Sequence, residues 1–256
     1  MKKNNKFTGI VFLLFAAVAC NMSVAKNKAT NVLEPAGDRF AVLELFTSEG
    51  CSSCPAADAV LAKLSKEYKE KVLALEFHVD YWNRLGWTDS FSNATFSRRQ
   101  EKYAVLFHLN SIYTPQVIIN GRHEMVGSDE TNIRSNILHE LKDTATQIIT
   151  LQSKMLNEKS IGVSYNVDTT SNALLNIALI QLHGETAVKG GENSGHILQH
   201  TNIVRDFKTV HVNEQSQGGI SLDVPKGLSA KDCKVIAYLQ DANDLHVKAV
   251  TESLLQ

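Results

Sequence analysis

Apolar positions in residues 39–146 follow two periods, and the change between them marks the predicted elements. Dense apolar runs of strand length predict buried strands, whereas apolar side chains recurring every three or four positions predict helices with one buried face. The pattern predicts a strand, a helix, a strand, a helix, two strands and a helix, in that order, at residues 39–46, 56–70, 71–82, 93–109, 113–121, 123–127 and 128–141. Alternating strands and helices indicate an α/β domain, a mixed sheet flanked by helices. The turn dipeptide Asn120-Gly121 predicts that the last two strands form a hairpin.

The pattern changes near residue 147. Short strand-like runs follow one another there without helical spacing, and turns rich in Gly, Asn, Asp and Ser separate them, at residues 148–153, 160–167, 173–182, 200–212, 219–224, 234–240 and 246–252. Many short strands without intervening helices favour two packed sheets. We therefore expect a second domain over residues 147–256, all-β and sandwich-like.

The first residues resemble an export signal. Three lysines precede the apolar run Ile10–Ala19, which is too short for an ordinary membrane span, and small residues follow it. Two interpretations remain open: ordinary cleavage after Ser23-Val24-Ala25, or lipidation of Cys20 as in a bacterial lipoprotein. Ordinary cleavage predicts a signal over residues 1–25, whereas lipidation predicts a signal that ends before Cys20. Both predict a flexible lead-in over 26–38 and an exported protein, periplasmic or secreted. Membrane contact is expected only through a lipid anchor at Cys20.

Composition narrows the function classes. The 256 residues are 43% hydrophobic and 21% charged, as in soluble globular proteins, and the net charge is -1. Without a long basic run, the chain is not expected to bind nucleic acid by electrostatics. Without a glycine-rich phosphate loop, no nucleotide is expected either.

The candidate chemistry lies in the C-x-x-C pair Cys51 and Cys54, between the first strand and the first helix. A helix start favours an anion, which lowers the pKa of a nearby thiol. Cys51 is therefore the predicted nucleophile, and Cys54 resolves the mixed disulfide. Pro55 fits the first helical turn, where its missing N–H costs little. Cys233 lies in a strand-like run, and we interpret it as a buried, unreactive side chain.

Two other interpretations of the pair are weaker. A structural disulfide this short would constrain the unfolded chain little. A structural zinc site normally needs four ligands, and no second C-x-x-C exists. The favoured prediction is a thiol–disulfide oxidoreductase whose dithiol is itself the redox group, without a separate cofactor, acting on a protein or small thiol or disulfide substrate.

The order of elements around the C-x-x-C resembles the thioredoxin fold. That resemblance implies that Pro115, before the third strand, is cis and lies against the cysteine pair, although only roughly 5 or 6% of X-Pro bonds are cis in folded proteins. It also implies that the backbone of Thr114 pairs with an extended substrate segment.

Four segments resemble one family more closely: "FTSEGCSSCPAAD", "FHVDYWNRLGW", "YTPQVIINGR" and "GENSGHILQHTNIVR". It is the secreted bacterial family numbered twelve-twenty-three among domains of unknown function, described as thioredoxin-like. The chain departs from ordinary thioredoxins at Gly50, where they carry tryptophan, and at Leu45, where they carry a buried acid. Glu44 precedes that position and points to the opposite strand face.

Polar residues on the second strand are the candidate proton carriers. Glu76, His78 and Asp80 share one face of a strand that is otherwise apolar, and a buried polar row is costly unless paired. Carboxyl ends of parallel strands also bind ligands in α/β folds. We expect His78 or Asp80 to lie near the cysteines; the alternative is that both only fix the following loop. Trp82 in that loop either lines a substrate groove or packs in the core.

Alternative functions also stay open. Two thiolates and an imidazole suit Cu(I), so Cys51, Cys54 and His78 are a candidate copper set. A non-catalytic scaffold with a locked disulfide is another alternative. Glu49, which precedes the pair, either perturbs the thiol or is a solvated turn carboxylate, and the solvated role is the expected one. The segment after the glycine-rich loop, with His196, His200 and Arg205, either binds a metal or partner or docks onto the first domain.

Overall fold

The computed structural model describes residues 39–168, 172–212 and 216–255. The predictions for the export signal, for Cys20 and for the lead-in at 26–38 lie outside these residues. Within the described part of the chain, none of the helices combines the length and the apolar character needed to span a membrane.

In the described residues the α-helices all precede residue 141, and strands dominate the rest of the chain. In chain order the elements are β1 (Ala41–Thr47), α1 (Cys54–Tyr68), β2 (Val72–His78), α2 (Ala94–Leu106), β3 (Gln116–Ile119), β4 (His123–Val126), α3 (Glu130–Glu140), β5 (Ile149–Asn157), β6 (Ser160–Val167), β7 (Ala173–Ala187), β8 (Ile197–Val212), β9 (Gln217–Asp223), β10 (Cys233–Asp241) and β11 (Val247–Leu254). Short 3-10 turns lie at Lys69–Lys71, Asn83–Leu85 and Ala230–Asp232.

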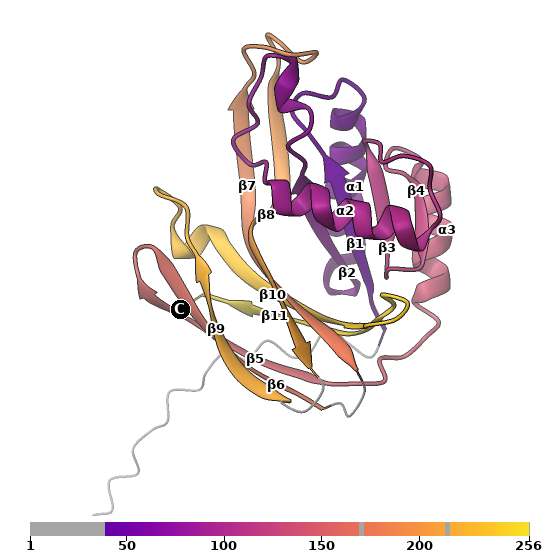
Figure 1. The fold of residues 1–256 in the computed structure, drawn as a ribbon, viewed down its shortest axis with the longest axis vertical. Coiled ribbons are helices and arrows are strands. Elements are labelled where there is room, and N and C mark those ends of the chain that lie inside the picture. The colour runs from indigo at the N-terminus through magenta and orange to yellow at the C-terminus, as the bar shows by residue number, and fades with distance from the viewer. Residues whose placement is uncertain (1–38, 169–171, 213–215, 256) are drawn as a thin grey trace, which may run out of the picture. The chain divides into compact units, whose positions relative to one another are not determined.

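A large mixed sheet joins both halves of the chain. Its eight strands run in the order β11-β10-β7-β8-β2-β1-β3-β4 (Figure 1). The β1 and β2 strands are parallel, and β3 and β4 form the predicted antiparallel hairpin with positive φ at Asn120 and Gly121. A parallel pairing of Glu76 with Ile203 connects β2 to β8. A second, antiparallel sheet has the order β5-β6-β9.

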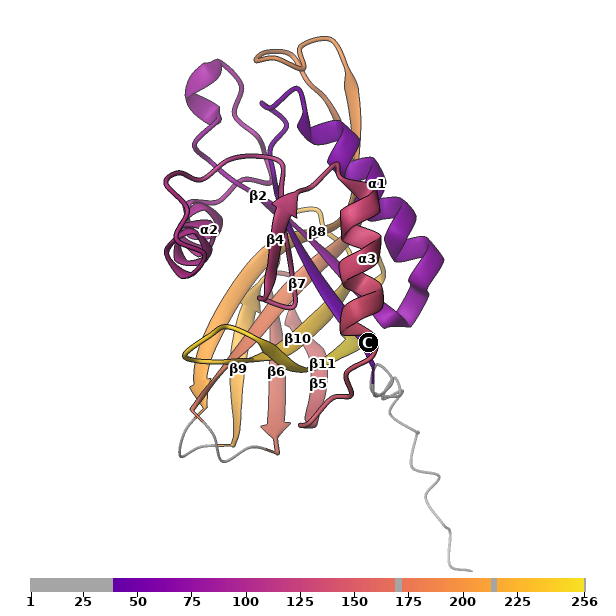
Figure 2. The same cartoon turned by 90° about the vertical axis from the view of Figure 1, so that its right-hand side faces the viewer.

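Helices cover both faces of the first four strands. In Figure 2, α1 and α3 lie on one side of these strands and α2 on the other. Leu61 and Leu64 of α1 pack with Ile133 and Ile137 of α3 against the side chains of β1 and β3. Leu138 of α3 is 55% exposed and takes no part in this core.

The predicted separate all-β sandwich is not confirmed. The β5-β6-β9 sheet does share a buried apolar core with β7, β10 and β11. However, β7 and β10 also belong to the large sheet, which continues through β8 into β2. The pattern also underestimated two strands, because β7 continues beyond residue 182 to Ala187 and β8 begins at Ile197, before residue 200. This β7–β8 hairpin extends toward the C-x-x-C segment.

A buried ion pair lies under α2. Glu44 of β1 accepts two hydrogen bonds from the Arg99 guanidinium, which also contacts the hydroxyl of Tyr238. Glu44 is 1% exposed, and Arg99 is 9% exposed. As predicted, Glu44 therefore faces away from α1, whereas Leu45 packs in the core on the α1 side.

Candidate functional site

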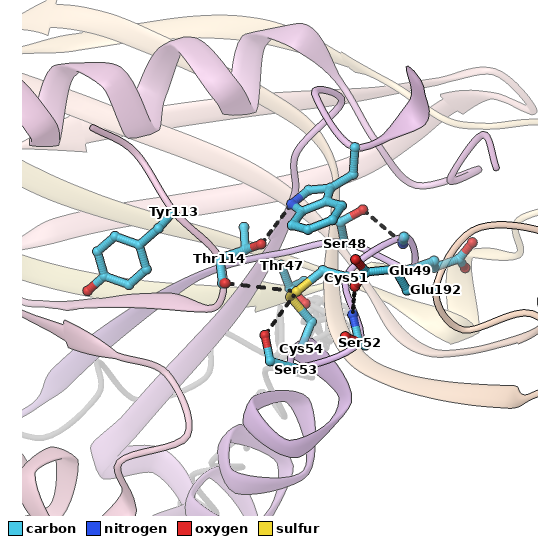
Figure 3. Close-up of a disulfide and its surroundings, with 12 residues drawn as sticks. Thr47, Ser48, Glu49, Cys51, Ser52, Ser53, Cys54, Tyr113, Thr114 and Glu192 are labelled. Carbon is cyan, nitrogen blue, oxygen red and sulfur yellow. Dashed lines mark hydrogen bonds between the residues drawn. A yellow bond between two sulfur atoms is a disulfide. The ribbon is translucent and has the colours of Figure 1, made fainter. Parts of the chain in front are cut away.

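The cysteine pair lies at the start of α1. Cys54 is the first residue of the helix, Pro55 lies in its first turn, and the Cys54 N–H donates to the Cys51 carbonyl at 3.2 Å. The two residues form a disulfide with Cα atoms 5.4 Å apart (Figure 3). Cys51 and Cys54 are 1% and 0% exposed, so neither sulfur is open to solvent in this conformation.

One wall of the disulfide comes from the segment before β3. The Thr114–Pro115 peptide bond is cis, which confirms the prediction of a cis bond before Pro115. The Cys51 Sγ lies 3.9 Å from the Thr114 carbonyl oxygen, on the same side as Ser53, whose Oγ is 3.3 Å away (Figure 3). The Thr114 carbonyl is thus a backbone group that borders Cys51 Sγ.

Trp82 packs beside this wall. Its indole Nε1–H donates to the Thr114 hydroxyl at 2.8 Å. A Cβ on Gly50 would lie 3.1 Å from the Trp82 Cβ, so this close approach favours glycine at position 50. Trp82 also packs against the core, where Phe77 lies. The indole therefore fixes the loop against the disulfide segment.

The other wall is the tip of the β7–β8 hairpin. The Asn193 side-chain amide donates to the carbonyls of Glu49 and Cys51, both at 2.9 Å. The Glu192 carboxylate accepts a hydrogen bond from the Ser52 N–H at 2.9 Å (Figure 3). These contacts agree with the predicted docking of the glycine-rich loop onto the first domain. They hold the backbone of the C-x-x-C turn.

Titratable side chains form a buried group between β1, β2, β8, α1 and the loop before α2. We call it the acid–imidazole cluster: Glu49, Asp58, Glu76, His78, Asp89 and His200. All six are at most 5% exposed. It is linked to the C-x-x-C segment at both ends of the cysteine pair, since Glu49 lies just before Cys51 and Asp58 lies one helical turn after Cys54.

His78 is held from one side only. Its Nδ1 lies 2.7 Å from Asp89 Oδ2, and Asp89 also accepts hydrogen bonds from the backbone N–H groups of Glu49 and Phe91. A carboxylate on Nδ1 orients the imidazole ring, so that Nε2 faces Glu76. That Nε2 has no hydrogen-bond partner and lies 3.8 Å from Glu76 Oε2.

His200 lies between three carboxylates. Its Nδ1 is 3.6 Å from Asp58 Oδ2 and 3.7 Å from Glu76 Oε2, and its Nε2 is 3.6 Å from Glu49 Oε1. Neither ring nitrogen makes a hydrogen bond. The expectation that Glu49 is solvated is wrong, because the Trp87 indole donates to its other oxygen at 2.7 Å and it is fully buried.

Burial and charge shift the titration of the cluster. Burial lowers the pKa of His78, but the charge and hydrogen bond of Asp89 outweigh it and raise the pKa to about 10. Burial likewise lowers the pKa of His200, yet two neighbouring carboxylates raise it to about 9. Burial raises the pKa of Glu76 to about 7. Glu76, His78 and His200 therefore hold protons more tightly than free side chains do.

The predicted residues separate into two groups. His78 joins the acid–imidazole cluster, whereas Asp80 accepts a hydrogen bond from the Ser97 hydroxyl and fixes the start of α2, which is the alternative role considered for it. No hydrogen bond among the described residues joins either side chain to a cysteine. Groups of three or more ligand atoms within 4.8 Å in the described residues contain no cysteine, so the structure does not assemble the Cys51, Cys54 and His78 copper set.

Sequence analysis missed Asp58 and Asp89. Asp58 had a signal, because it lies four residues after Cys54 and therefore on the same face of the helix. Asp89 lies in a polar loop without periodicity, and its role depends on a contact with His78.

Comparison with known proteins places the chain in a family. The family described as "Protein of unknown function (DUF1223)" matches residues 42–240. The chain belongs to this family. The match includes all four quoted segments, but the family description names no superfamily. The sequence-based assignment to the thioredoxin superfamily is therefore corrected to membership of this family alone.

Solved structures support the mixed α/β fold. The crystal structure of protein AGR_C_4864 from Agrobacterium tumefaciens is 30% identical, with a TM-score of 0.62, over 84% of this chain and 93% of that chain. A domain of the outer membrane lipoprotein Omp28 from Porphyromonas gingivalis is 16% identical, with a TM-score of 0.28, over 44% of this chain and 89% of that chain. The second likeness is too low to carry an argument. No curated protein matches the chain.

Proposed function

We propose that this protein is a thiol–disulfide oxidoreductase in which Cys51 and Cys54 alternate between a disulfide and a dithiol. The observation that carries the proposal is the disulfide at the first turn of α1, with Cys51 Sγ beside the Thr114 carbonyl. The arrangement of β1 to α3 is consistent with a thioredoxin-like α/β domain. The substrate class is a protein or small-molecule thiol or disulfide, and the dithiol supplies both electrons.

The proposed reaction has two exchange steps. The Cys51 thiolate attacks a substrate disulfide, forms a mixed disulfide and releases one substrate thiolate. The Cys54 thiolate then attacks Cys51 Sγ, which forms the Cys51–Cys54 disulfide and releases the second thiolate. The start of α1 stabilises the thiolates, because its unpaired N–H groups and dipole favour negative charge. The same steps in reverse oxidise a substrate dithiol.

Thr114 and Pro115 are the proposed substrate-positioning residues. An extended substrate segment would pair with the backbone at Thr114, whose carbonyl borders Cys51 Sγ. Because both sulfurs are buried, this pairing requires that the β7–β8 tip or the Trp82 loop moves away. The tip is the better candidate for the moving part, since its bonds to the cysteine segment include one at the exposed Ser52.

A trapping experiment tests the proposed function. In a Cys54→Ser variant, Cys51 attacks a substrate disulfide but the mixed disulfide is not resolved. We expect adducts with extracytoplasmic proteins that a reductant releases, and the matched Cys51→Ser variant should form none. Absence of adducts from both variants, or equal amounts from both, would contradict the proposal.

We also propose that the protein is exported. The signal-like pattern of residues 1–25 supports this, and disulfides persist in extracytoplasmic compartments. Mass spectrometry of the protein from fractionated cells tests it. A chain beginning at Lys26 indicates ordinary cleavage, and a lipid-modified Cys20 at the N-terminus indicates anchoring. A full-length chain in the cytoplasmic fraction would contradict export.

A further inference from the structure

The acid–imidazole cluster contains more unpaired polar atoms than a buried site normally tolerates. Buried polar groups in proteins are almost always hydrogen-bonded, because leaving one unpaired costs about 1 to 3 kcal/mol. Yet buried atoms without a hydrogen-bond partner converge at this cluster: Glu49 Oε1, Glu76 Oε1, His78 Nε2, His200 Nδ1 and His200 Nε2. A missing positive partner at this point would account for His78 Nε2 and His200 Nδ1, the two unpaired nitrogens that face Glu76.

Two of these nitrogens, His78 Nε2 and His200 Nδ1, lie near carboxylate oxygens of Glu76 and Asp58 at spacings close to those of ligands around one ion. The atom pairs Asp58 Oδ2–His200 Nδ1, His200 Nδ1–Glu76 Oε2 and Glu76 Oε2–His78 Nε2 are 3.6, 3.7 and 3.8 Å apart. These separations exceed hydrogen-bond distances of about 2.7 to 3.2 Å. Four ligands at about 2.0 to 2.2 Å from a tetrahedral ion lie about 3.3 to 3.6 Å from one another. The three separations are therefore close to those around a tetrahedral ion, and Asp58 reaches the group through His200.

From this geometry we propose that Glu76, His78 and His200 bind a divalent transition-metal ion, with Asp58 as the fourth ligand. Imidazole nitrogens and carboxylate oxygens suit Zn²⁺, and the set of two histidines and a carboxylate also suits Fe²⁺. The three principal ligand atoms already lie within 4.8 Å of one another.

The surroundings of the ligands match those of metal sites. Metal-bound histidines normally donate their second N–H to a carboxylate, which orients the ring. Asp89 holds Nδ1 of His78 at 2.7 Å, whereas Glu49 faces Nε2 of His200 at 3.6 Å, beyond hydrogen-bond distance. Asp89 is itself fixed by two backbone N–H groups. Each histidine therefore presents its remaining nitrogen toward Glu76.

Charge favours a cation at the same point. The cluster buries four carboxylates and two imidazoles. The Arg205 guanidinium carbon lies 4.7 Å from the Phe91 ring centre. Its positive charge interacts electrostatically with Asp89. With neutral imidazoles, four negative charges would remain, and a divalent ion cancels two of them. Such an ion would tie β2 and β8 to α1, directly below the cysteine segment.

The test uses the mature chain with Cys51 and Cys54 oxidised, so that no C-x-x-C thiolate competes for metal. After chelator treatment, calorimetric titration with Zn²⁺ should show one ion bound per chain and a raised Tm. Titration with Co²⁺ should give the visible bands of a tetrahedral ion without a thiolate charge-transfer band. Absence of stoichiometric uptake of either ion would overturn the proposal and leave protons as the partners of the carboxylates.

Matched variants locate the ion. Asp89→Asn keeps the side-chain size but removes the orienting charge, and should weaken Zn²⁺ affinity about 10- to 100-fold. Glu76→Gln should weaken it further, because it removes a ligand. His196→Asn is the control, since His196 is exposed, and it should bind like the wild type. Circular dichroism checks that each variant folds. Equal affinity in Glu76→Gln and His196→Asn would overturn the assignment.

Discussion

Replacing Asn193 by alanine tests whether the β7–β8 tip controls access to the disulfide. The Asn193 amide donates to two backbone carbonyls, of Glu49 and Cys51, and its side chain is buried against them. Alanine removes both donors but leaves the backbone of the tip unchanged. The variant should therefore favour a conformation in which the tip is open and Cys51 Sγ is exposed to a thiol.

The size of the effect follows from the two bonds. A neutral hydrogen bond contributes about 0.5 to 1.5 kcal/mol net, so two contribute about 1 to 3 kcal/mol. Since about 1.4 kcal/mol corresponds to a factor of ten, the open population should rise about 5- to 150-fold. If reduction occurs only from the open conformation, the rate of reduction should rise by the same factor.

The assay measures how fast a low concentration of dithiothreitol reduces the disulfide under native conditions. Acid quenching, thiol labelling and mass spectrometry give the reduced fraction at each time. Ser194→Ala is the matched control, because Ser194 is the exposed neighbour of Asn193, and its rate should stay at the wild-type value. An unchanged rate in Asn193→Ala would refute the reasoning and show that the thiol reaches the sulfur by another opening.

Two further predictions concern stability. Arg99→Met leaves Glu44 buried without its partner, so it should lower the free energy of unfolding by about 3 to 5 kcal/mol in denaturant titrations. The double variant Glu44→Gln/Arg99→Met should recover part of this loss. A loss below about 1 kcal/mol in Arg99→Met would be inconsistent with the buried pair. Burial raises the pKa of Glu140, but hydrogen bonds from Asn120 and His123 outweigh it and leave the pKa below its ordinary value. The folded-state pKa is depressed, so the carboxylate stabilises the fold above the unfolded pKa of about 4.5, and this contribution is lost as the pH falls through the folded value. The stability difference between wild type and Glu140→Gln should therefore be largest near neutral pH and shrink below about pH 4.5, whereas a difference independent of pH would argue against this ionised role.

The first half of the fold was predictable because its signals are local. Residues 72–78 are apolar except for Glu76 and His78, and all seven are buried, as in a parallel strand covered on both faces. The Asn120-Gly121 dipeptide fixes the hairpin, and Pro55 marks the first turn of α1. Each of these features depends only on neighbouring residues, so the sequence pattern contains them.

The junction between the two halves was not predictable from pattern. The pairing of β2 with β8 rests on a long-range contact of Glu76 with Ile203. The end of β7 at residues 183–187 is polar and largely exposed, so it carries no apolar signal.

The acid–imidazole cluster was not predictable from the pattern for the same reason, since it depends on long-range contacts. Glu76 and His78 were recognisable as a costly polar pair on a buried strand, but their partner His200 comes from β8 and is placed only by the fold. Glu49 looked like a solvated turn residue because its covering side chains, Trp87 and His200, also come from distant segments. Polar partners brought together by tertiary contacts leave no periodic trace in the sequence.

The most direct test of the central claim is the reduction potential of the Cys51–Cys54 pair in the metal-free mature protein. The pair would be equilibrated in glutathione buffers, or in a lower-potential dithiol buffer where glutathione does not reduce it. A working oxidoreductase should have a potential between about -270 and -120 mV. A value well below about -300 mV would identify a structural disulfide and contradict the proposed function.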